Sequence, residues 1–229
     1  SAATFFKNKN IALVGNPVRR SLLEQGIEKA SAKKNFGFNP ETPLILVICG
    51  SQGAKKINEF FLDVAANLTE YYQILHQTGV KNFDNFKKEL SVVFENSSEE
   101  KKNRYKIVPY FEENIKEAYA AADLVVSRAS SGVIFETAAF AKPAILVPLS
   151  EAVAAGDHQS RNAYEYAKNG AAAVIEEENL KPSIFLDQLG KLLSDTEKLK
   201  SMSEAAKKFS KPEAAKTIAE EILNLTKTY

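Results

Sequence analysis

Short apolar runs alternate with longer stretches of helix-forming residues along most of the chain. The apolar runs, rich in β-branched residues, fall at residues 11–14, 44–49, 72–75, 105–108, 124–126, 144–147 and 173–175. Several are apolar at nearly every position, which is typical of parallel strands that are buried on both faces. Helix formers fill the intervening residues 55–68, 115–122, 133–141 and 161–169. The alternation predicts an α/β fold, a parallel sheet with helices on both faces.

Two regions depart from this alternation. Residues 81–106 are charged and rich in Asn and Ser, and residues 96–102 within them predict a solvated surface turn. After residue 180 the strand-like runs stop, and the pattern is helical to the C-terminus. The last helix is expected at about residues 213–226. Its apolar face, which must pack against something, consists of Ala215, Ile218, Ala219, Ile222 and Leu225.

Composition narrows the class of protein. The 229 residues include 30 Lys and Arg against 29 Asp and Glu, and this balance gives no broad field for binding nucleic acid. The single cysteine, Cys49, cannot form an internal disulfide, and the two histidines, His76 and His158, are too far apart for a zinc motif. No apolar run approaches the roughly 20 residues that span a bilayer. We therefore expect a soluble cytoplasmic protein without a metal site.

The first candidate site follows the strongest predicted strand. Residues 50–53 read Gly-Ser-Gln-Gly, directly before a predicted helix. Glycines such as Gly53 let the backbone approach a ligand closely, and a helix N-terminus offers unpaired N–H groups to an anion. Ser51 adds a hydroxyl donor, with Gln52 beside it. The alternative is an ordinary tight turn between strand and helix, and the segment matches neither the dinucleotide pattern nor the P-loop.

A second candidate follows the strand at residues 124–126. Arg128 leads into Ser130, Ser131 and Gly132, which open the helix that carries Glu136. A diphosphate at this helix start would gain about 1 kcal/mol from the helix dipole. The alternative is a serine N-cap with no ligand. Glu136 either stabilises the helix dipole or accepts hydrogen bonds from a vicinal diol such as ribose, and its apolar neighbours favour the second interpretation.

Two further polar segments follow predicted strands. Residues 156–162 concentrate groups that can hold sugar hydroxyls, with Asp157 as an N-cap in the alternative interpretation. His158 within this segment has no identifiable partner for acid–base catalysis. Residues 15–19 place Pro17 at a first helical position. Arg19 in this segment is either a phosphate contact or a surface charge.

Five motifs together resemble the C-terminal domain of the MurG glycosyltransferase family. In chain order they are Gly-Asn-Pro-Val-Arg at 15–19, Gly-Ser-Gln-Gly-Ala at 50–54, His-Gln-Thr-Gly at 76–79, residues 128–136, and Asp-His-Gln at 157–159 with Asn-Ala at 162–163. The resemblance covers nearly the whole chain. It implies a Rossmann-like sheet that forms the C-terminal half of a GT-B fold. It also implies transfer of N-acetylglucosamine from UDP-N-acetylglucosamine to an undecaprenyl-diphosphate-linked muramyl-pentapeptide.

The resemblance also implies roles for individual residues. The backbone at Phe111 and Glu112 would read uracil, and Glu136 would hold the ribose hydroxyls. Ser51, Arg19 and the backbone at residues 131–133 would hold the diphosphate, and Gln159, with His158, would hold the sugar. The residues implied to bind substrate are Arg19, Ser51, Gln52, Gly53, Phe111, Glu112, Arg128, Ser131, Gly132, Val133, Glu136, His158 and Gln159. Transfer would invert the anomeric carbon without cofactor or metal, in agreement with the absence of an Asp-x-Asp sequence.

The family fold has a second domain, which the resemblance places before this chain. That N-terminal domain carries the acceptor loop, the presumed general base and the membrane-contacting patch, so no catalytic residue is assigned here. We expect residues 1–229 to form one nucleotide-sugar-binding domain, with residues 1–10 as a leading tail. The terminal helix, at about residues 211–229, would pack on the missing domain. The full-length protein would be peripheral on the inner face of the bacterial membrane. A non-catalytic donor-binding subunit and a UDP-sugar epimerase remain alternatives.

Overall fold

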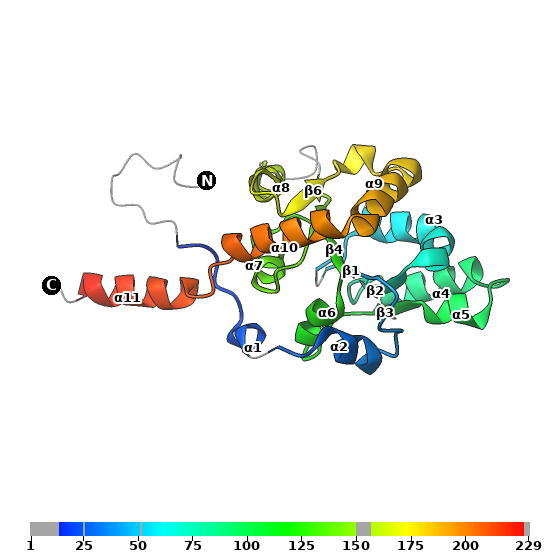
Figure 1. The fold of residues 1–229 in the computed structure, drawn as a ribbon, viewed down its shortest axis with the longest axis horizontal. Helices are drawn as coiled ribbons and strands as arrows, with labels where there is room; N and C mark the ends of the chain where they lie inside the picture. The colour runs from blue at the N-terminus through cyan, green and yellow to red at the C-terminus, as the bar shows by residue number, and fades with distance from the viewer. Residues whose placement is uncertain (1–13, 25, 51, 150–156, 227–229) are drawn as a thin grey trace.

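The computed structural model describes residues 14–24, 26–50, 52–149 and 157–226. They form a parallel sheet of six strands in the order β3-β2-β1-β4-β5-β6 (Figure 1). The strands are β1 Leu44–Ile48, β2 Gln73–Gln77, β3 Tyr105–Val108, β4 Leu124–Ser127, β5 Ala144–Leu146 and β6 Ala172–Val174. The chain runs outward from β1 to β3, returns to β4 beside β1, and runs outward again. The β1–β4 boundary is therefore the topological switch point, where such sheets bind ligands.

The predicted fold class is confirmed, and six of the seven expected strands form. Strand β1 is buried at all five positions because helices cover both faces of the sheet. Its side chains alternate, since Leu46 packs into one core cluster and Val47 into the other. Of the expected strand at residues 11–14, residues 11–13 lie outside the described residues, and Val14 is not in a strand.

Helices cover the sheet in two layers (Figure 1). One layer contains α2 Lys29–Asn35, α6 Ile115–Ala121, α7 Ser131–Ala139 and α8 His158–Lys168. The other contains α3 Lys55–Tyr71, α4 Phe83–Val93 and α9 Pro182–Ser194. Helix α10 Thr196–Phe209 contributes to both clusters. The remaining elements are α1 Arg20–Leu23, α5 Glu99–Asn103, a 3₁₀ turn η2 Glu177–Asn179 and α11 Ala214–Thr226.

The prediction for residues 96–102 was wrong from residue 99 onward, where α5 begins. Ser98 is the N-cap of this helix, and its side chain accepts a hydrogen bond from the Lys101 N–H. Acidic residues in the first turn and lysines in the last turn suit the helix dipole. The charged composition that predicted a solvated turn is equally compatible with a short, exposed, well-capped helix.

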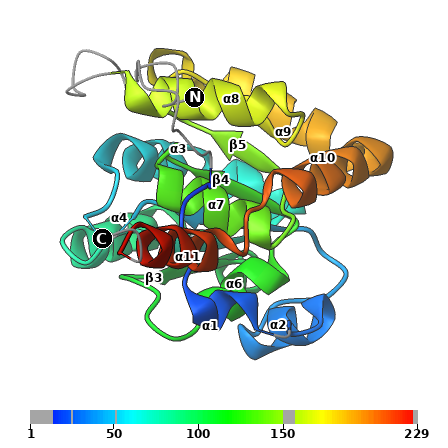
Figure 2. The ribbon, with the colours of Figure 1, turned by 90° about the vertical axis from the view of Figure 1, so that its left-hand side faces the viewer.

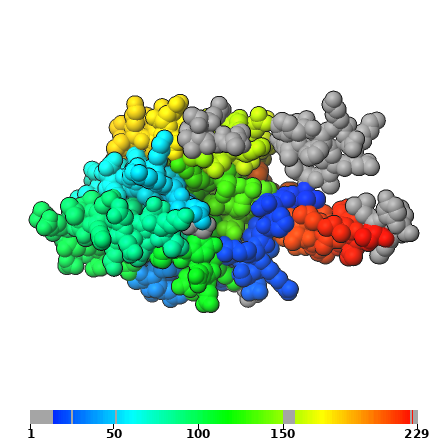
Figure 3. Space-filling model, turned by 180° about the vertical axis from the view of Figure 1, so that it is seen from behind, coloured from blue at the N-terminus to red at the C-terminus, as the bar shows by residue number. Residues whose placement is uncertain are grey.

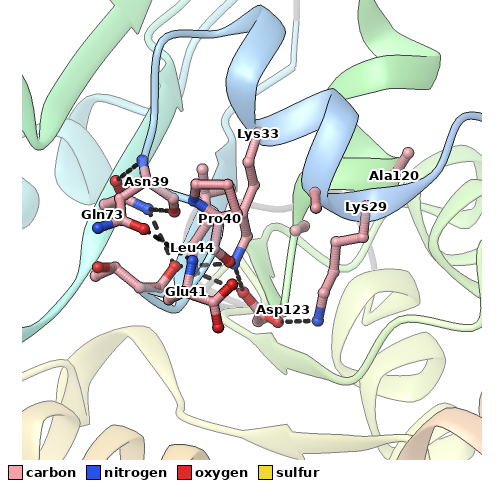
Figure 4. Close-up of polar contacts among 12 residues, drawn as sticks. Lys29, Lys33, Asn39, Pro40, Glu41, Leu44, Gln73, Ala120 and Asp123 are labelled. Carbon is pink, nitrogen blue, oxygen red and sulfur yellow. Dashed lines mark hydrogen bonds and ion pairs between the residues drawn. The ribbon is translucent and has the colours of Figure 1, made fainter.

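A buried ionic cluster fixes α2 to the amino-terminal edge of the sheet (Figure 4). Lys33, only 2% exposed, lies 2.7 Å from the Asp123 carboxylate, and Lys29 binds its other oxygen at 2.6 Å. Asp123 also accepts the Leu44 N–H at 2.8 Å. Although burial opposes ionisation, these hydrogen bonds hold the pKa of Asp123 below its ordinary value. The cluster stabilises the edge that lies opposite the carboxyl ends of the strands.

The last helix, α11, extends beyond the two helical layers (Figures 1, 2 and 3). Ala214 at its start is buried, whereas Ile222 and Leu223 are 56% and 57% exposed. The expected apolar face is therefore largely uncovered, although the Leu225 side chain lies outside the description. At its base, a Cβ added to Gly15 would lie 2.7 Å from the Cβ of Lys211. The segment around Gly15 thus packs against the segment that follows α10.

Candidate functional site

A cleft with a volume of about 570 Å³ lies at the carboxyl ends of the central strands. Ile48 of β1 pairs with Ser127 of β4, so the loops that follow these strands leave the sheet side by side. Residues of both loops line the cleft, together with parts of α3, α7 and α8. Among the lining residues are Gly50, Gln52, Gly53, Arg128, Ser130, Val133 and Gln159. The two segments predicted to bind phosphate therefore share one cavity.

The turn after β1 is tight and is packed against the loop after β2. The Gly53 N–H donates to the Gly50 carbonyl at 3.2 Å. Gly53 has φ +77°, and a Cβ at this position would lie 2.5 Å from the Thr78 carbonyl oxygen. On the other side, a Cβ on Gly79 would lie 2.4 Å from the Gly53 nitrogen. Only glycine permits this contact between the two backbones. Gln52 is exposed at the mouth of the turn, and Ser51 lies outside the described residues.

Two helices begin at the cleft without a side-chain cap. Helix α3 has Ala54 and α7 has Ser130 at the N-cap, and neither side chain accepts a capping hydrogen bond. The first backbone hydrogen bond of each helix is donated by the N–H of Asn58 in α3 and by the N–H of Ile134 in α7. The N–H groups of the first turns, including those of Ser131, Gly132 and Val133, are therefore directed toward the end of the helix that meets the cleft. The serine-cap alternative does not describe α7, and the arrangement favours an anion.

Arg128 lines the cleft, but its guanidinium is bound to the protein. Its Nη1 donates to the carbonyls of Val147 and Pro148 at 3.2 and 3.1 Å, and its Nη2 pairs with Glu177. The Glu177 side chain is 1% exposed, and its second oxygen binds Lys56 at 3.0 Å. Burial opposes ionisation of Glu177, but the two cations hold its pKa below the ordinary value. Sequence reasoning missed this ion-pair network, because its members are distant in sequence.

Glu136 lies one helical turn into α7 and has two partners. One carboxylate oxygen, Oε1, accepts from Arg19 Nε at 3.1 Å, and the other, Oε2, accepts from the Tyr119 hydroxyl at 3.3 Å. Glu136 is 18% exposed and Arg19 44% exposed. The structure thus brings together two predicted site residues that are separated by 117 positions. It also adds Tyr119, which no sequence pattern indicated. These residues are not among those that line the cleft.

The predicted base-reading segment follows β3. Phe111 is only 4% exposed, and its ring packs edge-on against Phe36 with centroids 6.3 Å apart. Its N–H donates to Gln77 Oε1 at 3.1 Å, so this donor is already engaged. Glu112 is exposed. The motif at residues 76–79 includes Gln77, the last residue of β2, but its hydrogen bond to the Phe111 segment was not foreseen from the sequence.

At the start of α8, the two predicted sugar contacts have different surroundings. Gln159 lines the cleft, and its Oε1 accepts the Leu149 N–H at 3.1 Å. His158 is exposed and is not among the described residues that line the cleft. Asp157 occupies the N-cap position without a capping bond from its side chain, which contacts Arg161 at 3.2 Å.

The conspicuous motif at residues 76–79 is structural. His76 is buried between Asn58 and Tyr105. Because the Asn58 amide nitrogen donates to Thr78, its oxygen faces His76 and accepts the Nε2–H, while Nδ1 accepts from the Tyr105 hydroxyl. Burial lowers the pKa of His76 to about 3. Burial likewise raises the pKa of Cys49, the neighbouring thiol, to about 12. Neither group is ionised at neutral pH.

The described part of the chain contains neither a metal-ligand cluster nor a membrane-spanning helix. No group of three or more His, Cys, Asp or Glu side chains there has the arrangement that holds a metal ion. No helix within the same residues combines the length and the apolar character that a membrane span requires.

Fold and cleft define the class of protein as a GT-B glycosyltransferase domain. The chain matches the family model described as "Glycosyltransferase family 28 C-terminal domain" over residues 44–218 and belongs to this family. It is 35% identical to the UDP-N-acetylglucosamine–N-acetylmuramyl-(pentapeptide) pyrophosphoryl-undecaprenol N-acetylglucosamine transferase of Lactobacillus helveticus, over 94% of this chain and 56% of the relative. The resemblance to MurG predicted from the motifs is confirmed.

Solved structures agree on the fold. MurG of Acinetobacter baumannii has a TM-score of 0.69 at 24% identity, over 95% of this chain and 58% of that one. A putative UDP-N-acetylglucosamine 2-epimerase from Listeria monocytogenes has a TM-score of 0.62 at 15% identity, over 90% of this chain and 50% of that one. The chain spans less than two thirds of the length of each of these proteins and of the Lactobacillus relative.

Proposed function

We propose that this chain is the UDP-N-acetylglucosamine-binding domain of an inverting N-acetylglucosaminyltransferase of peptidoglycan synthesis. The observation that carries the proposal is the convergence of two uncapped helix N-termini, those of α3 and α7, on one cleft at the switch point of the sheet. Such amides bind a diphosphate through hydrogen bonds and the helix dipole. The name of the Lactobacillus relative supports the choice of donor.

The donor would extend across the residues around the cleft. The diphosphate would lie against the amides of the first turn of α3 and of residues 131–133, with Ser51 and Arg19 beside it. Glu136 would accept the ribose hydroxyls, and Gln159, with His158, would hold the sugar. The Phe111 N–H is engaged by Gln77. We therefore assign the reading of uracil to the exposed backbone at Glu112, with Phe111 as the apolar support beneath it.

The amides of α3 and α7 would also contribute to catalysis. When an acceptor hydroxyl attacks the anomeric carbon, negative charge develops on the departing UDP. Fixed N–H donors and Lys55 at the start of α3 would stabilise that charge. The general base and the muramyl-pentapeptide acceptor site would come from a second domain, against which the exposed face of α11 would pack. Membrane contact on the cytoplasmic side would belong to that domain.

Nucleotide titration tests the proposed donor site. Calorimetric titration of the chain with UDP, ADP and GDP should give clear binding of UDP and at least about tenfold weaker binding of the purine nucleotides, a difference of about 1.4 kcal/mol. UDP-N-acetylglucosamine should compete with UDP for the same site. Equal affinity for the three nucleoside diphosphates would show that the cleft is a general anion site, and this result would overturn the proposal.

The ribose role makes a separate prediction. Glu136→Gln should weaken UDP binding by about 1–3 kcal/mol, because hydrogen bonds to a charged acceptor are lost. Glu165→Gln on α8 is a matched control, since this side chain is exposed away from the cleft. Calorimetry should show unchanged UDP affinity for the control. Unchanged affinity for Glu136→Gln would remove Glu136 from the site.

Epimerisation of UDP-N-acetylglucosamine is the second candidate, because the Listeria epimerase shares the fold. Incubation of the chain with UDP-N-acetylglucosamine, without an acceptor, separates the two functions. NMR of the sugar should show no epimer if the chain is a transferase domain. Accumulation of the 2-epimer would favour the alternative. A non-catalytic donor-binding subunit would bind the donor equally and would need a separate acceptor-site protein.

A further inference from the structure

Tyr119 is a fully buried phenol on α6, close to the proposed nucleotide site. Its exposed fraction is 0%, and its ring stacks on Phe140 with centroids 5.0 Å apart and planes 13° apart. A buried tyrosine hydroxyl normally has a hydrogen-bond partner. Here the partner is the carboxylate of Glu136, at 3.3 Å from the hydroxyl oxygen. Tyr119 therefore links the rigid core to a site residue.

The two partners of Glu136 differ in exposure. Arg19 reaches Oε1 from the surface with a side chain that is 44% exposed, so water and ligand can compete for it. Tyr119 reaches Oε2 from within the core, where the stacked Phe140 fixes its ring. A carboxylate has about four lone-pair directions, so the hydrogen bond from the Tyr119 hydroxyl leaves acceptor capacity for other donors. Of these two partners, Tyr119 is the one that holds Glu136 from within the core.

We propose that Tyr119 is a positioning residue that orients Glu136 toward the 2′- and 3′-hydroxyls of a uridine nucleotide. The inference rests on the proposed function, because it assumes that Glu136 receives the ribose. The Tyr119 hydroxyl holds Oε2, and the ribose hydroxyls donate to the acceptor positions on the side of Arg19. Preorganisation of this kind increases affinity because the carboxylate does not have to be ordered when the ligand binds.

The test compares binding of UDP and 2′-deoxy-UDP to wild type and Tyr119→Phe. The ratio of the two affinities measures the contribution of the 2′-hydroxyl, whereas a general loss of structure weakens both ligands alike. We expect Tyr119→Phe to reduce the wild-type preference for UDP about fivefold, the net effect of one typical hydrogen bond. An unchanged preference in a folded Tyr119→Phe variant would overturn the role of Tyr119.

The chain provides a matched control in Tyr166→Phe. Tyr166 is also fully buried, but its hydroxyl has no hydrogen-bond partner among the described residues. Removing this hydroxyl makes the same chemical change away from Glu136 and should leave the preference for UDP unchanged. Should Tyr119→Phe fail to fold, Phe140→Leu is the second variant. It removes the ring that fixes Tyr119 and should reduce the same preference, and a wild-type preference in that variant would overturn the inference.

Glu136→Gln separates failure of this inference from failure of the proposed function. If Glu136→Gln retains the wild-type preference for UDP over 2′-deoxy-UDP, Glu136 does not bind ribose and that part of the proposed function fails. If Glu136→Gln loses the preference but Tyr119→Phe retains it, only the role of Tyr119 is wrong. In the double variant, Tyr119→Phe should have no additional effect on the preference, because Tyr119 acts through Glu136.

Discussion

Replacement of Arg128 by Met should lower the free energy of unfolding by about 3 kcal/mol, the lower end of the range for breaking a buried ion pair. The substitution removes two hydrogen bonds to the carbonyls of Val147 and Pro148 and leaves Glu177 buried with only Lys56 as a partner. Because Lys56 still neutralises part of the charge, the loss should not reach the upper end of that range. Urea denaturation measures the change.

An exposed ion pair provides the control for this prediction. Lys191→Met removes the partner of Asp187, in a pair whose side chains are 74% and 62% exposed. Exposed pairs of this kind contribute about 0.3–0.5 kcal/mol, so stability should hardly change. If Arg128→Met retained wild-type stability but bound UDP poorly, Arg128 would be a ligand-binding cation and not a residue that stabilises the fold through Glu177.

Acidification should destabilise the domain well before its carboxylates titrate. The folded-state pKa of His76 is lowered to about 3 from 6.5, so between these values the unfolded chain binds a proton that the folded chain does not. Stability conferred by neutral His76 is fully present above pH 6.5 and is lost as the pH falls toward 3. The maximal slope for one proton is about 1.4 kcal/mol per pH unit. Urea denaturation between pH 7 and 5 measures this effect separately from that of Asp123 and Glu177, because carboxyl groups with lowered pKa values affect stability only at lower pH.

The two histidines serve as each other's control. His76→Leu should remove the slope between pH 7 and 5, although it should also lower stability at every pH because the Asn58 and Tyr105 partners lose their hydrogen bonds. His158→Gln should preserve the slope, since His158 is exposed to water in the folded chain. A wild-type slope in His76→Leu would show that another group causes the acid sensitivity.

The features that could be predicted from the sequence, the strands and the turn at the cleft, depend on local patterns of residues. Buried apolar runs identified the strands, and Gly50 and Gly53 after one of them identified the turn at the cleft, because backbone geometry there requires glycine. The neighbouring helix start at residues 131–133 was found from its serines, which suit a helix start, and not from a backbone requirement, since Gly132 has open space around the position of a Cβ. Parallel strands bring such turns to one edge of the sheet, so their shared cleft followed from topology.

What could not be predicted depends on pairs of side chains distant in sequence. Arg128 was expected among the substrate-binding residues, but its guanidinium is held by Glu177, which lies 49 positions later and carries no motif. The hydrogen bond between Tyr119 and Glu136 joins two helices, and neither helix pattern indicates a phenol that points at a carboxylate. The cap at Ser98 illustrates a local limit, since a charged Asn- and Ser-rich stretch is compatible with both a turn and a short helix.

The close packing of Gly15 against Lys211 has a mechanical consequence. Because a Cβ at residue 15 would overlap the Lys211 side chain, a side chain larger than that of glycine at residue 15 would displace the segment that leads into α11. Four residues later the same segment carries Arg19, whose guanidinium holds Glu136. The segment that leads into α11 thus packs against the backbone four residues before the cation that pairs with the carboxylate on α7.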